Sequence, residues 1–128
     1  MIPFLKIYLS VLIPFAVIDG AWIGFVARGF YARHIGFLIN TFNPISAGLF
    51  YAFYAAGLSY FVARPMIGEP LPKLFLAGAF FGLVAYASYD FTNQATIREW
   101  PVIVTIADLA WGAFATGAAA TIAAFLTR

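Results

Sequence analysis

Four long apolar stretches constrain this chain more than any other feature of its sequence. They cover residues 4–27, 44–63, 72–93 and 101–126, and each has the ~20 residues that a helix needs to cross a bilayer. Hydrophobic residues make up 64% of the chain and charged residues 9%, against about 25% charged residues in a soluble domain. The sequence therefore predicts an all-α membrane protein, a bundle of four transmembrane helices with short loops, forming one integral-membrane domain over residues 1–128.

Helix-start signals precede the second and fourth stretches. Asn43 is a favourable N-cap residue, and Pro44 suits the first position of a helix. Before the fourth stretch, Thr96 and Glu99 have the spacing of a capping box, whereas Pro101 fits a helix start equally well. Both alternatives stay open at this point.

The expected loops are residues 28–43, 64–72 and 94–100. Four spans place both termini and the second loop on one side of the membrane, and the first and third loops on the other. The terminal side has four basic residues, Lys6, Arg64, Lys73 and Arg128, and the other side has three, Arg28, Arg33 and Arg98. The positive-inside rule thus favours cytoplasmic termini by one residue, and dual topology remains open.

Several classes of function are disfavoured by composition. There is no cysteine, which excludes thiol catalysis and thiolate metal sites, and the single histidine, His34, cannot form a multi-imidazole site alone. The net charge of +2 is too small and too scattered for nucleic-acid binding. We predict no catalytic residues and no metal site, and the identity of any cofactor stays unknown.

Three aspartates lie inside the apolar stretches, where an unpaired carboxylate costs several kcal/mol. At about 1.5 Å of rise per residue, Asp19 lies roughly 13 Å from the first loop at Arg28. Asp108 lies roughly 10 Å from the third loop at Pro101, and Asp90 roughly 5 Å from it. All three therefore fall in the half of the bilayer that faces the first and third loops.

Aromatic and polar residues accompany these aspartates. Trp22 and Trp111 each follow an aspartate at i+3, on the same helix face. The third stretch adds a tyrosine at i−4 and an asparagine at i+3 from its aspartate. We predict a ligand- or ion-binding site made of Asp19, Trp22, Tyr86, Asp90, Asn93, Asp108 and Trp111. The candidate cationic partners on this side are Arg28, Arg33, His34 and Arg98.

Simpler interpretations of the aspartates stay open. Asp90 is shallow, so it could be an ordinary interfacial residue or hydrogen-bond partner. Asp19 and Asp108 could each accept a hydrogen bond from the indole N–H of a tryptophan on the other helix. In that case the carboxylates would be a packing device rather than a binding site.

Glycines indicate where helices approach one another. Gly20 and Gly24, Gly78 and Gly82, and the fourth stretch with Gly112 and Gly117 have spacings that permit close backbone contact in lipid. We expect a tight four-helix bundle rather than a dimer interface. The many small residues of the fourth stretch predict a central position for it.

One segment resembles a known family. Residues 89–93 read Tyr-Asp-Phe-Thr-Asn, Trp100-Pro101 follows, and residues 108–112 read Asp-Leu-Ala-Trp-Gly. This pattern resembles the DUF2177 family of bacterial predicted membrane proteins, in which leucine is usual at the position of Phe91. The element Asp19-x-x-Trp22 and the chain length also fit. The resemblance implies a four-span bacterial inner-membrane protein and supplies no activity.

Three functions compete on this evidence. The first is transport or channelling of a small cation or a proton-coupled solute, because buried carboxylates can exchange a proton for a cation. The second is an accessory membrane subunit that binds a lipid, a pigment or a protein partner. The third is a lipid-active membrane enzyme, which the lack of any nucleophile–base motif disfavours. The expected partners are the bilayer and a small cationic or apolar ligand; a homo-oligomer is possible but not indicated.

Overall fold

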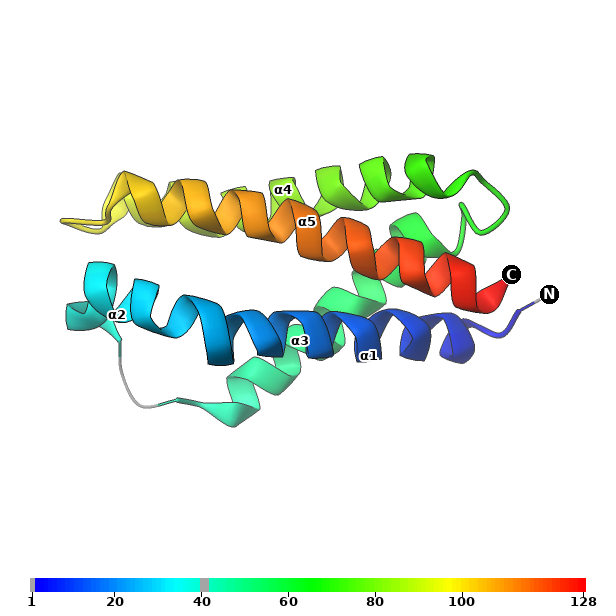
Figure 1. Cartoon of the computed structure of the whole chain (residues 1–128), viewed down its shortest axis with the longest axis horizontal. Helices are drawn as coiled ribbons and strands as arrows, with labels where there is room; N and C mark the ends of the chain where they lie inside the picture. Colours follow the sequence, from blue (N-terminus) through cyan, green and yellow to red (C-terminus); the bar gives the residue numbers. More distant parts are fainter. Residues whose placement is uncertain (1, 40–41) are drawn as a thin grey trace.

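The computed structural model describes residues 2–39 and 42–128, and these residues form helices and turns without any strand. Four helices are long and apolar enough to cross a membrane: Phe4–Leu38, Pro44–Ala63, Leu71–Thr96 and Val102–Thr127. The predicted bundle of four transmembrane helices is confirmed. Figure 1 shows both termini at the same end as the turn that precedes α4 (Leu71–Thr96). The turn between α4 and α5 (Val102–Thr127) lies at the opposite end, as the alternation of spans predicts.

The first helix is much longer than predicted. It consists of α1 (Phe4–Ala21), a π-helical segment (Trp22–Ala27), α2 (Arg28–Ile35) and a 3₁₀ turn (Gly36–Leu38). The loop predicted to start at residue 28 was therefore wrong, because arginine and alanine are good helix formers and their presence does not end a helix. The remaining connection to α3 (Pro44–Leu58) includes residues 40 and 41, which lie outside the described part of the chain.

The start of α3 is confirmed. The Asn43 side-chain oxygen accepts hydrogen bonds from the backbone N–H groups of Ile45 and Ser46, both at 3.1 Å, and Pro44 is the first helical residue. The helix continues beyond Leu58 as a π-helical segment, Ser59–Ala63, so the predicted end of this span at residue 63 is also confirmed.

Replacing Asn43 with alanine is expected to lower the free energy of unfolding by about 1 kcal/mol, because two N–H groups of α3 lose their acceptor. Asn43→Asp keeps the acceptor and should be close to the wild type. Equilibrium unfolding in mixed micelles measures both variants. An alanine variant as stable as the aspartate variant would show that water replaces this cap at no cost.

The start of α5 decides between the two alternatives at the third loop. Thr96 is the last residue of α4, so it does not cap the next helix. Pro101 directly precedes α5, which begins at Val102, and no side chain caps this end. Glu99 has a positive φ of 65°, a left-handed conformation that turns the chain sharply between the two helices. The proline interpretation was therefore right to within one residue.

Helices α4 and α5 lie side by side and antiparallel (Figure 1) and pack through glycine. A Cβ atom placed on Gly78 would lie 3.0 Å from the Gly117 Cα, and one on Gly82 would overlap the Gly112 carbonyl oxygen. These four glycines confirm the predicted close approach. The prediction was wrong for Gly20 and Gly24, because a Cβ atom there would meet no heavy atom within 4 Å.

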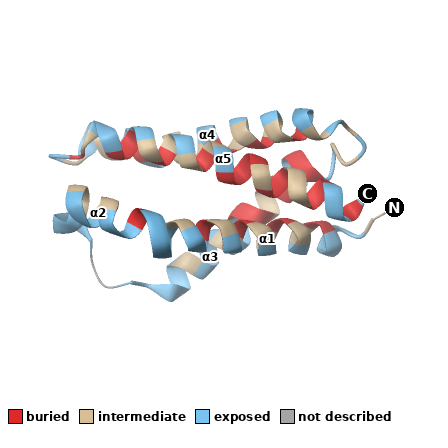
Figure 2. Ribbon diagram, in the orientation of Figure 1, coloured by how far each residue is buried: buried red, intermediate tan, exposed pale blue. Residues whose placement is uncertain are grey.

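The hydrophobic core occupies the half of the bundle near the termini. Helix α5 has the longest series of buried residues (Figure 2), in agreement with its predicted central position. Its alanine-rich half packs with Ile7, Val11 and Phe15 of α1 and with Leu58 at the end of α3. Toward the opposite end these small and aliphatic side chains give way to aromatic and acidic ones, which surround a cavity.

Candidate functional site

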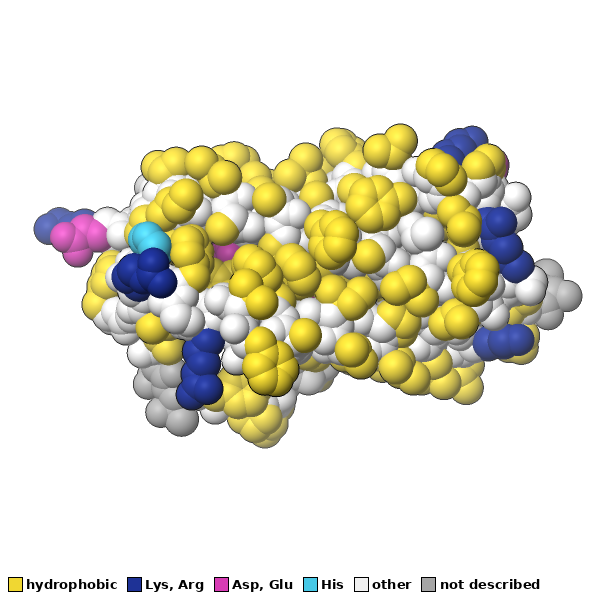
Figure 3. Space-filling model, in the orientation of Figure 1, with side chains coloured by type: hydrophobic (Ala, Val, Ile, Leu, Met, Phe, Trp, Pro, Cys, Tyr) yellow, Lys and Arg dark blue, Asp and Glu magenta, His cyan; other side chains and the backbone are white. Residues whose placement is uncertain are grey.

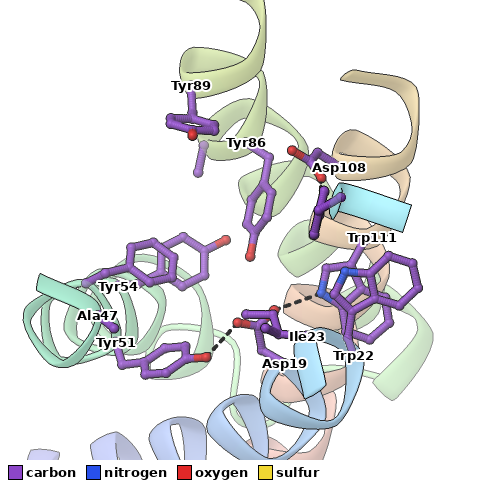
Figure 4. A pocket seen from close by; sticks show the side chains of 13 residues that line it. Asp19, Trp22, Ile23, Ala47, Tyr51, Tyr54, Tyr86, Tyr89, Asp108 and Trp111 are labelled. Atoms are coloured by element: carbon purple, nitrogen blue, oxygen red, sulfur yellow. Dashed lines mark hydrogen bonds between the residues drawn. The ribbon is translucent and has the colours of Figure 1, made fainter. Parts of the chain in front are cut away.

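A cavity of about 540 Å³ lies between the helices in this second half of the bundle. Every helix contributes to its wall, which is mostly aromatic with two carboxylates (Figure 4). The lining residues are Asp19, Trp22, Ile23, Tyr31, Ala47, Phe50, Tyr51, Tyr54, Ala85, Tyr86, Tyr89, Asp108 and Trp111. Five of the seven predicted site residues are among them: Asp19, Trp22, Tyr86, Asp108 and Trp111.

Asp19 is held by donors from two other helices. Its side chain is 5% exposed, and one carboxylate oxygen accepts a hydrogen bond of 2.7 Å from the Tyr51 hydroxyl of α3. The other oxygen accepts one of 2.9 Å from the indole N–H of Trp111 on α5. Figure 4 shows both bonds at the cavity wall. The interpretation of Asp19 as an acceptor for a tryptophan of another helix is thus confirmed, and the same carboxylate also faces the cavity.

The two tryptophans form one side of the cavity. Trp22 and Trp111 stack with their ring centroids 4.4 Å apart and their planes 10° from parallel. Each tryptophan ends an Asp-x-Ala-Trp segment, residues 19–22 and 108–111, and the antiparallel packing of α1 against α5 brings the two segments together. The buried indole nitrogen of Trp22 has no hydrogen-bond partner in the described residues.

Asp108 lies one helical turn from Trp111 on α5, also at the cavity wall (Figure 4), and is 8% exposed. It accepts a hydrogen bond from the hydroxyl group of Tyr31 on α2. The predicted tryptophan partner is therefore replaced by a tyrosine at this carboxylate. Because Tyr31 belongs to the helix that sequence reasoning had assigned to a loop, its role was missed.

Asp90 lies behind the cavity wall. It is 0% exposed, does not line the cavity, and neither of its oxygens has a hydrogen-bond partner in the described residues. The antiparallel packing of α4 and α5 places Asp90 opposite Asp108: the Tyr86 ring faces Gly112, and the two aspartates each lie four residues further toward the same end of the helix pair. The interpretation of Asp90 as an ordinary interfacial residue or hydrogen-bond partner was wrong, because the side chain is fully buried and neither oxygen has a partner in the described residues. Asn93 is half-buried and does not line the cavity.

The expected cationic partners do not reach the aspartates. In residues 2–39 and 42–128, the ion pair that forms is Lys73 with Glu69, at 3.4 Å near the terminal end. His34 bonds the Phe30 carbonyl oxygen through Nδ1 at 2.9 Å. Figure 3 shows the basic side chains at the two ends of the molecule and a small acidic patch among hydrophobic side chains. Across this described part of the chain, no three His, Asp or Glu side chains are grouped as metal ligands.

Four tyrosines of the site were not predicted: Tyr31, Tyr51, Tyr54 and Tyr89. Tyr51 follows Pro44 by seven residues, which places it at about 10 Å from the first loop, the depth expected of Asp108. Tyr54 follows at i+3 on the same face, and its hydroxyl group is 2.7 Å from the Thr116 hydroxyl. The same count of helical rise therefore predicts that Tyr51 and Tyr54 lie inside the span near the aspartates.

The cavity places the segments that carry the family resemblance next to one another. Tyr89 and Trp111 line it, and Asp90 lies just behind its wall. No curated protein and no solved structure matches the chain. One family profile, described as "Predicted membrane protein (DUF2177)", matches residues 4–125, which is nearly the whole sequence. The chain is therefore a member of the DUF2177 family of predicted membrane proteins.

Proposed function

We propose that this protein binds a small organic cation in the cavity and carries it across the membrane. One observation supports the proposal above the others. The cavity wall contains two carboxylates and eight aromatic side chains, and among the described residues no lysine, arginine or histidine lines it. A carboxylate at membrane depth needs a counter-charge, and a bound cation supplies one.

The chemistry of the wall favours an organic cation over a metal ion. Divalent metal ions such as Ca²⁺ require six or more oxygen ligands, whereas most atoms around this cavity belong to aromatic rings. An alkylammonium group interacts favourably with the faces of tryptophan and tyrosine rings, and its carbon atoms gain from contact with them. The cavity volume of about 540 Å³ is in the range of small-molecule sites.

Transport is tested with tetraethylammonium as the probe. Purified protein in liposomes is expected to take up the radiolabelled cation faster than protein-free liposomes do. Asp19→Asn should reduce the rate by at least about 30-fold, because one buried charge partner contributes 2–5 kcal/mol to a bound cation. Glu69→Gln is the matched control, since it also removes one carboxylate but lies in the turn before α4.

Two results would contradict the proposal. One is uptake at the protein-free level by wild-type protein, and the other is uptake by Asp19→Asn at the wild-type rate. Size-exclusion chromatography and circular dichroism establish that the variant is folded. Saturable binding of tetraethylammonium to wild-type protein without any flux would instead favour the accessory binding subunit, which the mostly apolar cavity wall also suits.

A further inference from the structure

We propose that Asp90 and Asp108 together hold one proton and form a proton-binding pair beside the cavity, separate from Asp19. The existence of the pair does not depend on transport. Its role in exchanging a proton for a bound cation rests on the proposed function.

The two carboxyl groups of the pair have different surroundings. Asp90 of α4 is completely buried and has no hydrogen-bond donor in the described residues for either oxygen. Asp108 of α5 lies opposite Asp90 in the antiparallel packing of the two helices, lines the cavity and accepts a hydrogen bond from Tyr31. Asp90 is thus shielded from solvent and has no hydrogen-bond donor, whereas Asp108 has a donor and faces the cavity.

Two neighbouring carboxylates cannot both stay ionised in such surroundings. Each would lose its hydration, and their like charges would repel each other at low dielectric constant. A proton shared between them removes one charge, and on Asp90 it lets this otherwise unpartnered carboxyl group donate a hydrogen bond to the Asp108 carboxylate. The proton stays mainly on Asp90, because the Tyr31 hydroxyl and the cavity stabilise the ionised form of Asp108.

No other group in the described residues provides the missing positive charge. The polar side chains that line the cavity beside the pair are Asp19, Trp22, Tyr31, Tyr51, Tyr54, Tyr86 and Tyr89, and Asn93 follows Asp90 by one turn on α4. All of them are neutral or acidic. Arg28, Arg33 and Arg98 are exposed and form no ion pair with either carboxylate, and His34 bonds a backbone carbonyl oxygen.

Binding of an organic cation should therefore release a proton. Before binding, the pair carries one negative charge and one proton. The arriving positive charge stabilises a second carboxylate, so the shared proton leaves for the aqueous phase and the pair becomes doubly ionised. Charge balances, since one cation enters the site as one proton leaves it.

Infrared spectroscopy tests the pair without any ligand. Wild-type protein at neutral pH is expected to show the carbonyl band of a protonated carboxylic acid, shifted in D₂O. Asp90→Asn should lose the band, because Asp108 alone has a donor and an opening and stays ionised. Asp108→Asn should keep it, since Asp90 alone remains buried without a donor.

A wild-type spectrum without the band, or an Asp90→Asn spectrum that retains it, would overturn the proposal. Glu69→Gln is the control that removes a carboxylate and no band.

Proton release tests the exchange. In weakly buffered detergent solution with a pH indicator, tetraethylammonium is expected to release up to about one proton per bound cation from wild-type protein. The probe has no acidic proton of its own. Its apparent affinity should fall about tenfold for each pH unit of acidification in the range where the pair is protonated. Asp90→Asn should bind the probe without proton release and with little dependence on pH.

The two experiments separate this inference from the proposed function. If wild-type protein does not bind tetraethylammonium, the proposed function fails, and the infrared band still decides whether the pair holds a proton. If the probe binds and Asp90→Asn releases as many protons as wild-type protein, the pair is overturned while cation binding stands.

Discussion

Replacing Trp111 with alanine is expected to lower the free energy of unfolding by about 3 kcal/mol, the lower end of the range for loss of a large aromatic side chain, because Trp111 is half-buried. Three interactions disappear together. The stack with Trp22 at 4.4 Å is lost, the contact with Phe114 at 5.8 Å is lost, and one oxygen of Asp19 loses its N–H donor. Equilibrium unfolding in mixed micelles, followed by circular dichroism, measures the effect.

Trp111→Phe separates the hydrogen bond from the packing. Phenylalanine keeps an aromatic ring against Trp22 but has no N–H group for Asp19. We expect this variant to lose about 1.5–3 kcal/mol, the contribution of a hydrogen bond to a charged group. A phenylalanine variant as stable as the wild type would show that the Tyr51 hydroxyl, or water, satisfies Asp19 without the indole.

Replacing Gly82 with alanine is expected to destabilise the protein by about 2–3 kcal/mol, the upper range for overpacking by one carbon atom. The added Cβ would overlap the Gly112 carbonyl oxygen and lie 2.6 Å from the Thr116 Cβ, both of them part of the facing helix. A backbone carbonyl group cannot rotate away, so α4 and α5 would have to separate.

Gly20→Ala is the matched control for this substitution. Gly20 also lies within a helix, but an added Cβ there meets nothing within 4 Å. It should leave the stability unchanged or raise it slightly, because alanine favours the helix by up to about 1 kcal/mol. Equal stability changes for the two variants would contradict the assignment of Gly82 to a tight helix contact.

Hydropathy and spacing predicted the four spans, their alternating direction and the end of the bundle at which the aspartates lie. They could not predict which face of each helix is buried. Helices α3 and α4 are apolar on nearly all sides, so Tyr51 on α3 has no special position in a hydropathy pattern. Its partner Asp19 is 32 residues away in the chain, and only the packing of the helices brings the two together.

The depth estimates were partly right for the wrong reason. Asp19 was placed by counting from Arg28 as the end of a span, yet the helix continues past that residue. The position of Asp19 along the bundle is set instead by Trp111, whose indole N–H donates to it. Trp111 itself lies one helical turn from Asp108. Asp90 was estimated as shallow because α4 was expected to end at residue 93, three residues too early. Polar residues near the end of a span made the loops look longer than they are.

The π-helical segment between Asp19 and Tyr31 sets the direction in which the second residue points. Along an unbroken α-helix, the 12 steps between these residues would leave Tyr31 about 120° around the helix axis from Asp19. A π-helical turn takes up about one extra residue, or about 100° of rotation, which leaves the two about 20° apart. One wide turn thus returns Tyr31 to the angular position of Asp19, so that a single helix supplies both a carboxylate and, three turns further on, a hydroxyl group to the same cavity.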